Sequence, residues 1–196
     1  RDWLKHLNPS INPIVIPYGI EVPKILNDDK SKISTLGYLG KLNKNKGIED
    51  LIDVYEKLLK KENFNKLEPN LLIGGVGSKN YISSINKRIS NKNIQFLGYV
   101  EDRYNFFNSI KVFIFPSYSE GLGLVLLEAM SHGVLCITRD VTPMNSIIKN
   151  GENGFLFKDN NELIEKIEKA INLNSSEKDK IVKSALEKIE KSYSIM

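Results

Sequence analysis

The sequence has little of what a secreted or membrane-spanning protein is built from. Cys136 is the single cysteine among 196 residues, so no disulfide can form within the chain, and this is typical of a reducing compartment. No apolar run approaches the roughly eighteen residues that a transmembrane helix requires. There is no signal peptide, and the chain opens on Arg1 rather than on a methionine. We therefore interpret it as a cytoplasmic fragment of a longer protein.

A strong charge imbalance is also missing. The chain has 28 Lys and Arg against 24 Asp and Glu, a formal net charge of +4, and its lysines are spread along the sequence rather than clustered with aromatics. These features do not favour a nucleic-acid partner. The length allows one domain with a substantial core and is too short for two full Rossmann-like lobes.

Apolar runs of strand length alternate with segments of helical period along the chain. We predict strands at 14–16, 33–39, 71–73, 94–97, 111–115 and 134–138. We predict helices at 48–59, 81–89, 101–109, 122–130, 145–150, 162–173 and 177–191. This alternation predicts an α/β fold, a Rossmann-like parallel sheet with helices on both faces. Ligands of such sheets bind beyond the carboxyl ends of the strands. The residues that follow predicted strand ends include Lys41, Lys46, Gly75, Tyr99, Glu120 and Gly121.

Residues 115–130 are the most informative stretch: they read as the end of a strand, a glycine-containing loop and the first turns of a helix. Pro116 ends a buried strand, Ser117 begins a turn, and Gly121 and Gly123 allow close approach to the backbone. The helix that follows is apolar almost throughout, so we expect it to be buried nearly all round. Glu128 is the exception, because an unpaired carboxylate in such a helix is costly and needs hydrogen-bond donors.

Glu120 and Glu128 suggest two ends of one ligand. If the segment is helical throughout, they lie roughly 12 Å apart along the axis at ~1.5 Å per residue, about the span of a nucleotide sugar. Free N–H groups from Gly121 to Leu124 would meet a diphosphate between them. The alternative is that Glu128 pairs with a buried lysine and Glu120 merely caps the helix, and this stretch alone leaves both open.

Two glycine-containing loops complete the pattern. Residues 40–47 place Lys41 and Lys46 beside Gly40 and Gly47, and a diphosphate requires such cations and approachable backbone; a solvated lysine loop is the alternative. The second loop contains Gly75, followed by Val76 and Gly77. Its spacing fails the Gly-x-Gly-x-x-Gly dinucleotide fingerprint and is most simply a strand-to-helix turn.

These motifs resemble those of the retaining glycosyltransferases of family 4, which have a GT-B fold. The resemblance covers roughly residues 14–193 and is carried by Pro-Ser, Glu-Gly-x-Gly-Leu and Glu-Ala-Met in 116–130 and by Gly-Lys-Leu-x-x-x-Lys-Gly in 40–47. The segment 151–156 matches the family's Asn-Gly-x-Asn-Gly-Phe-Leu turn. The chain departs from the family at Lys41, where Arg is usual and a bidentate fork is lost, and at Asn145 and Ser146, which replace Pro-Glu. Tyr18 and Glu21 replace the usual Asn and Asp.

The resemblance implies that residues 1–196 are the C-terminal, donor-binding lobe and that the N-terminal acceptor lobe is absent. The implied reaction is metal-independent transfer of a hexose, with retention, from a UDP- or GDP-sugar to an acceptor hydroxyl in cell-envelope polysaccharide synthesis. No Asp-x-Asp motif appears, no cofactor is implied, and the fragment alone is expected to be inactive. The missing lobe would provide any peripheral association with the inner face of the membrane.

The family's roles transfer to individual residues. Glu120 would contact the transferred sugar, Lys41 and Lys46 would hold the phosphates, and Glu128 would bind the ribose. Tyr99 and Val100 would face the base. The full predicted donor-binding set is Gly40, Lys41, Lys46, Gly75, Tyr99, Val100, Ser117, Glu120, Gly121, Leu122, Gly123, Leu124 and Glu128, with Glu120, Lys41 and Lys46 as the catalytic members and no metal ligand.

Two other functions fit the same fold. One is a non-catalytic module that binds a nucleotide sugar or saccharide. The other is a different enzyme such as an NAD-dependent oxidoreductase, against which the broken glycine fingerprint argues.

Overall fold

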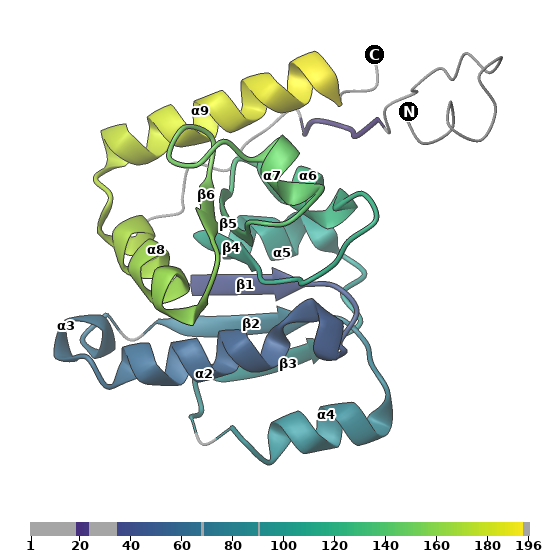
Figure 1. Ribbon diagram of the computed structural model, residues 1–196, viewed down its shortest axis with the longest axis vertical. Helices are drawn as coiled ribbons and strands as arrows, with labels where there is room; N and C mark the ends of the chain where they lie inside the picture. The colour runs from purple at the N-terminus through teal and green to yellow at the C-terminus, as the bar shows by residue number, and fades with distance from the viewer. Residues whose placement is uncertain (1–18, 24–34, 68, 90, 194–196) are drawn as a thin grey trace, which may run out of the picture.

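A computed structural model describes residues 19–23, 35–67, 69–89 and 91–193 (Figure 1). The strand predicted at 14–16 and the start of the one at 33–39 lie outside these residues. The described part contains a six-stranded, entirely parallel sheet in the order β3-β2-β1-β4-β5-β6. Its strands are β1 (Thr35–Leu39), β2 (Asn70–Gly74), β3 (Ile94–Gly98), β4 (Val112–Phe115), β5 (Leu135–Arg139) and β6 (Phe155–Phe157). The predicted Rossmann-like α/β fold is confirmed.

Helices cover both faces of this sheet (Figure 1). On one side α2 packs against α8, and on the other α6 packs against α9. The helical segments are η1 (Lys44–Lys46), α2 (Ile48–Leu59), α3 (Glu62–Asn65), α4 (Lys79–Asn86), α5 (Arg103–Ser109), α6 (Leu124–Ser131), α7 (Met144–Ile147), α8 (Asn160–Asn172) and α9 (Ser175–Ser192). Strands β1, β4 and β5 lie inside the sheet and every residue in them is buried, which explains why they are predominantly apolar.

Local hydrogen bonds set the helix ends, and some differ from the predicted ones. Helix α7 stops at Ile147 rather than at residue 150. Beyond it the Asn153 side chain accepts from the Lys149 N–H at 2.7 Å and donates to the Ile147 carbonyl at 3.2 Å, which replaces the helical pattern. Helix α9 begins two residues earlier than predicted, because Asn174 and Glu177 form a reciprocal capping box.

The core is continuous and rich in aromatics. Phe106 and Phe107 are buried, whereas Tyr104 from the same helix is exposed. Ile20 lies beside Tyr193, the residue that follows α9, and its N–H donates to the Tyr193 carbonyl at 2.6 Å. Among the described residues, no helix is both long and apolar enough to cross a lipid bilayer.

Candidate functional site

The loops that follow β1, β2 and β3 are joined through their backbones. Gly40 N–H donates to the Gly74 carbonyl at 3.0 Å, and Gly75 N–H donates to the Gly98 carbonyl at 2.6 Å. Gly75 has a φ of +135°, and a Cβ atom there would lie 1.7 Å from the Gly40 carbonyl oxygen. Glycine is therefore required at Gly75 by the packing of one loop on another.

Lys46 and Glu120 meet at this edge of the sheet. The Lys46 Nζ atom lies 2.7 Å from Glu120 Oε1, and the two side chains are 19% and 13% exposed. Ser117 Oγ donates to the same carboxylate at 2.7 Å. The structure thus brings together three predicted site residues from two loops that are 74 positions apart in the sequence. A shielded pair of this kind is held more strongly than a surface ion pair, because water screens it less.

Lys41 lies in the same loop with its side chain exposed. Its carbonyl accepts a 3.0 Å hydrogen bond from the hydroxyl of Tyr38, a residue of β1. Burial raises the pKa of Tyr38 well above its ordinary value, and the Glu120 charge adds to this effect. Tyr38 therefore remains a neutral donor that anchors the lysine loop to the sheet.

Helix α6 begins later than the sequence predicts. Gly123 has a φ of 70° and precedes the first helical residue, Leu124, so residues 121–123 are not helical. The axial spacing of ~1.5 Å per residue therefore does not apply between Glu120 and Glu128, because that spacing assumed a helix throughout the segment. Leu124 and Val125 are only partly buried, so α6 is not enclosed on every side.

Glu128 lies on this less enclosed side and already has a partner. Arg103 Nη1, from the first turn of α5, donates to Glu128 Oε1 at 2.8 Å and to Oε2 at 2.7 Å. The arginine side chain is 53% exposed and the carboxylate 26%. The alternative of a buried lysine partner was wrong, and Arg103 was missed because nothing in the sequence connects it with Glu128.

Exposed apolar side chains lie in the same set of loops. Val76 follows β2, Tyr99 follows β3 and is 73% exposed, and Leu122 lies in the loop after β4. Val100, predicted to lie with Tyr99, is partly buried and packs against the core. Exposed apolar side chains beyond the carboxyl ends of three parallel strands are consistent with a surface that binds a ligand or a second lobe.

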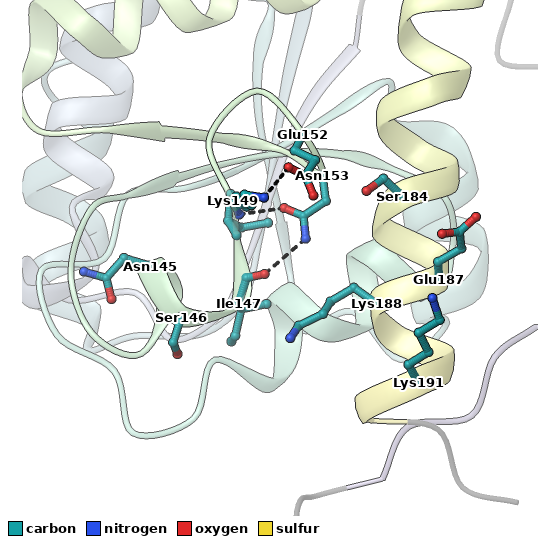
Figure 2. A pocket seen from close by; sticks show the side chains of 11 residues that line it. Asn145, Ser146, Ile147, Lys149, Glu152, Asn153, Ser184, Glu187, Lys188 and Lys191 are labelled. Atoms are coloured by element: carbon teal, nitrogen blue, oxygen red, sulfur yellow. Dashed lines mark hydrogen bonds and ion pairs between the residues drawn. The ribbon is translucent and has the colours of Figure 1, made fainter.

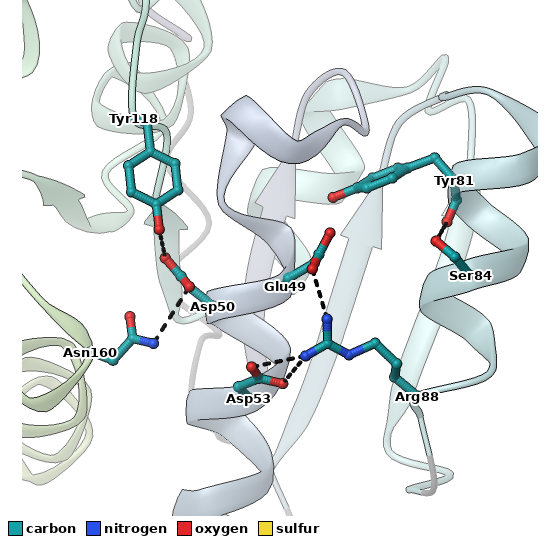
Figure 3. A network of polar contacts seen from close by, with 8 residues as sticks. All are labelled: Glu49, Asp50, Asp53, Tyr81, Ser84, Arg88, Tyr118 and Asn160. Atoms are coloured by element: carbon teal, nitrogen blue, oxygen red, sulfur yellow. Dashed lines mark hydrogen bonds and ion pairs between the residues drawn. The ribbon is translucent and has the colours of Figure 1, made fainter.

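A buried arginine that the sequence analysis missed supports the loop after β4. Arg139 ends β5, and its Nη2 atom lies 2.6 Å from Asp50 Oδ2 in the first turn of α2. Asp50 also accepts from the Tyr118 hydroxyl, and this hydrogen bond raises the pKa of Tyr118 (Figure 3). One feature of the sequence could have indicated this ion pair: an arginine stands directly after the predicted strand 134–138.

A separate cavity of about 460 Å³ lies between the segment around α7 and helix α9 (Figure 2). Asn145 and Ser146, the residues that depart from the family pattern, lie at its edge, and none of the predicted donor-binding residues lines it. Its lining residues are Asn145, Ser146, Ile147, Ile148, Lys149, Glu152, Asn153, Ser184, Glu187, Lys188 and Lys191. The candidate site and this cavity are therefore different places on the molecule.

Known proteins match the chain over most of its length. The family described as Glycosyl transferases group 1 matches residues 22–188. The Staphylococcus aureus protein CapM, described as a capsular polysaccharide biosynthesis glycosyltransferase, is 36% identical over 153 residues, which is 76% of this chain and 38% of CapM. The chain thus spans about two fifths of this relative.

Two solved structures have the same fold. A mutant of Staphylococcus aureus TarM, crystallised with UDP among its ligands, gives a TM-score of 0.82 at 24% identity, over 97% of this chain and 39% of TarM. The C-terminal domain of the group 1 glycosyl transferase LpcC from Francisella tularensis gives 0.73 at 21% identity, over 91% of this chain and 96% of that domain.

Proposed function

The chain belongs to the glycosyl transferases group 1 family, and on this premise we propose that residues 1–196 form the donor-binding lobe of a retaining family 4 transferase. The lobe would bind a nucleotide diphosphate sugar and present its hexose to an acceptor hydroxyl on a second lobe. The similarity to CapM supports an acceptor in cell-envelope polysaccharide synthesis, and the UDP bound to TarM supports UDP over GDP. We place this activity in the cytoplasm, with any contact to the inner face of the membrane made by the second lobe.

The observation that carries the proposal is the Lys46–Glu120 pair with its Ser117 hydrogen bond. It lies beyond the carboxyl ends of β1 and β4, where ligands of parallel sheets bind. A diphosphate beside the pair would take Lys46 as a counter-ion. Glu120 would then be free to accept hydrogen bonds from the sugar, as the family resemblance implies.

The proposed chemistry follows from charge. Cleavage of the bond between sugar and diphosphate leaves negative charge on the departing phosphate, and preplaced positive groups stabilise this charge most in the transition state. Lys41 and Lys46 are the cations that we assign to this task, together with backbone N–H groups from Gly121 to Leu124. With two ammonium groups in place, we propose that the reaction needs no metal ion.

The comparison with CapM supports a second lobe, because this chain matches 38% of that longer protein. We therefore propose that the isolated lobe binds donor and that turnover requires the second lobe.

The direct test is a calorimetric titration of the 196-residue chain with UDP, GDP, ADP and uridine, backed by ligand-observed NMR for weak binding. We expect UDP to bind more tightly than GDP, ADP or uridine, and equally well in EDTA and in magnesium. A chain that binds none of the diphosphates would contradict the proposal. Binding of UDP only with magnesium would contradict metal independence alone.

Lys41→Ala should separate phosphate contact from nucleoside contact. We expect UDP affinity to fall about 10- to 100-fold, because a charge-assisted hydrogen bond is lost, while uridine affinity stays unchanged. Lys57→Ala is the matched control, since it removes the same charge from the far end of α2. Equal losses for UDP and uridine would argue against a phosphate contact at Lys41.

A further inference from the structure

Arg139 is a buried cation whose partners come from several parts of the chain. Its side chain is 8% exposed. Nε donates to the Pro116 carbonyl at 3.0 Å, Nη1 to the Lys158 carbonyl at 3.1 Å, and Nη2 pairs with Asp50 at 2.6 Å. The guanidinium carbon also lies 4.0 Å from the centre of the Tyr118 ring. One side chain therefore holds three separate segments of the chain.

Two of those segments carry the proposed donor-binding residues. Pro116 immediately precedes Ser117 and opens the loop that contains Glu120. Asp50 lies in the first turn of α2, four residues after Lys46 (Figure 3). Arg139 thus connects the start of the motif loop directly with the helix that follows the lysine loop.

Further contacts join the same two loops. Tyr118 N–H donates to the Asn45 carbonyl at 2.9 Å, and the Tyr118 hydroxyl donates to Asp50. A Cβ atom at Gly47 would lie 2.3 Å from the Pro116 carbonyl oxygen, the same oxygen that Arg139 holds. The backbones at Pro116 and Gly47 are therefore in close contact, and a small displacement there would move Lys46 relative to Glu120.

A purely structural role does not call for an arginine. Removing a cation from water is costly, and a well-packed apolar residue of similar volume often serves a core equally well or better. An apolar residue cannot provide donors of fixed direction, whereas the planar guanidinium presents five. The benefit of Arg139 is therefore the position that it imposes on Pro116 and Asp50.

We propose that Arg139 and Asp50 are positioning residues that hold Lys46 and Glu120 at the spacing which a bound sugar diphosphate requires. The proposal rests on the donor-binding function proposed above and adds to it two residues that touch no donor. Their loss would weaken binding of the diphosphate part of the ligand and leave the nucleoside part unchanged.

The test compares UDP and uridine affinities in Arg139→Met, Arg139→Lys and Asp50→Asn. We expect each to lower UDP affinity about tenfold or more while uridine affinity stays within about twofold, since small misplacements of binding groups are costly. Arg139→Lys keeps the charge and loses the fork, so we expect an intermediate loss. Circular dichroism and urea unfolding establish that each variant is folded, and Asp50→Asn alone decides the matter if both Arg139 variants unfold.

Arg88→Met is the matched control. Arg88 pairs with Glu49 at 2.7 Å and with Asp53 at 2.9 Å on the same helix α2, but it lies on the surface (Figure 3). We expect this variant to bind UDP and uridine as the unmodified chain does.

A spectroscopic measurement reports the geometry independently of the ligand. The hydrogen bond to Asp50 raises the pKa of Tyr118, so Asp50→Asn should shift one tyrosine titration to lower pH, and Tyr118→Phe should remove that titration. If the unmodified chain binds UDP and the folded variants keep its ratio of UDP to uridine affinity, the inference is overturned and the proposed function stands. If the unmodified chain binds no UDP, the proposed function fails and the inference fails with it.

Discussion

At the scale of single residues, Glu128 shows how a carboxylate can lie in an apolar helix. Arg103 spans both of its oxygens, so the charge is neutralised in the absence of any ligand. A ribose that bound to Glu128 would have to share or displace this partner. Because the Arg103 side chain is 53% exposed, water can solvate its charge when the ion pair breaks. The pair therefore contributes little to the free energy of unfolding.

Glu128→Ala should therefore affect binding more than folding. We expect affinity for UDP and for uridine to fall together by about 1–3 kcal/mol, the value of an unpaired hydrogen-bonding group, because both ligands carry the ribose. Calorimetry on the folded variant measures this change. Arg103→Ala serves as the comparison, since it breaks the ion pair and leaves the carboxylate available. Unchanged uridine affinity in Glu128→Ala would exclude the ribose contact.

At the scale of elements, the loops after β1 and β2 depend on backbone contact. Leu42 N–H donates to the Val76 carbonyl at 2.8 Å, in addition to the Gly40–Gly74 bond. Both bonds require the approach of Gly75 to Gly40, which no side chain would allow. The lysine loop is thereby held in place by the neighbouring loop as well as by its own turn.

Gly75→Ala should open this contact. We expect the free energy of unfolding to fall by about 3 kcal/mol, from backbone strain together with separation of the loops, as measured by urea denaturation. Gly151→Ala is the matched control, because Gly151 also has a positive φ, 80°, but faces open space. We expect it to cost only about 1 kcal/mol. Similar decreases in the free energy of unfolding of the two variants would show that the contact between the loops does not contribute to stability.

At the scale of the whole molecule, buried phenols make stability depend on alkaline pH. The Tyr55 side chain is fully buried, its hydroxyl donates to the Pro69 carbonyl, and burial raises its pKa to about 12. In the unfolded chain tyrosine loses its proton near pH 10. The contribution of protonated Tyr55 to the free energy of unfolding is therefore fully present below pH 10 and is lost as the pH rises from about 10 to 12.

Tyr55→Phe isolates this contribution. Between pH 10 and 12 the free energy of unfolding of the unmodified chain should fall more steeply than that of the variant, by up to about 1.4 kcal/mol per pH unit. Urea denaturation at pH 8, 10 and 11 measures both slopes, and the variant controls for lysine deprotonation. Parallel slopes would contradict the assignment of the shift to Tyr55.

The sequence by itself determined the class of fold and the edge of the sheet at which Lys46, Ser117 and Glu120 meet. Runs such as 112–115 are apolar at every position, as strands covered on both faces must be, and they alternate with segments of helical period. Lys46, Ser117 and Glu120 follow such runs, so their common edge could be predicted. These signals lie within a few neighbouring residues and need no knowledge of distant partners.

Only the tertiary structure decided which side chains meet. Arg139 and Asp50 are 89 positions apart, and Arg103 and Glu128 come from different helices. The start of α6 likewise depends on where Gly123 turns, so residues 121–123 are not helical, although the sequence predicts a helix for 122 and 123. The physical reason is that period and propensity act along the chain, whereas an ion pair forms only where packing closes long loops and removes water around both charges.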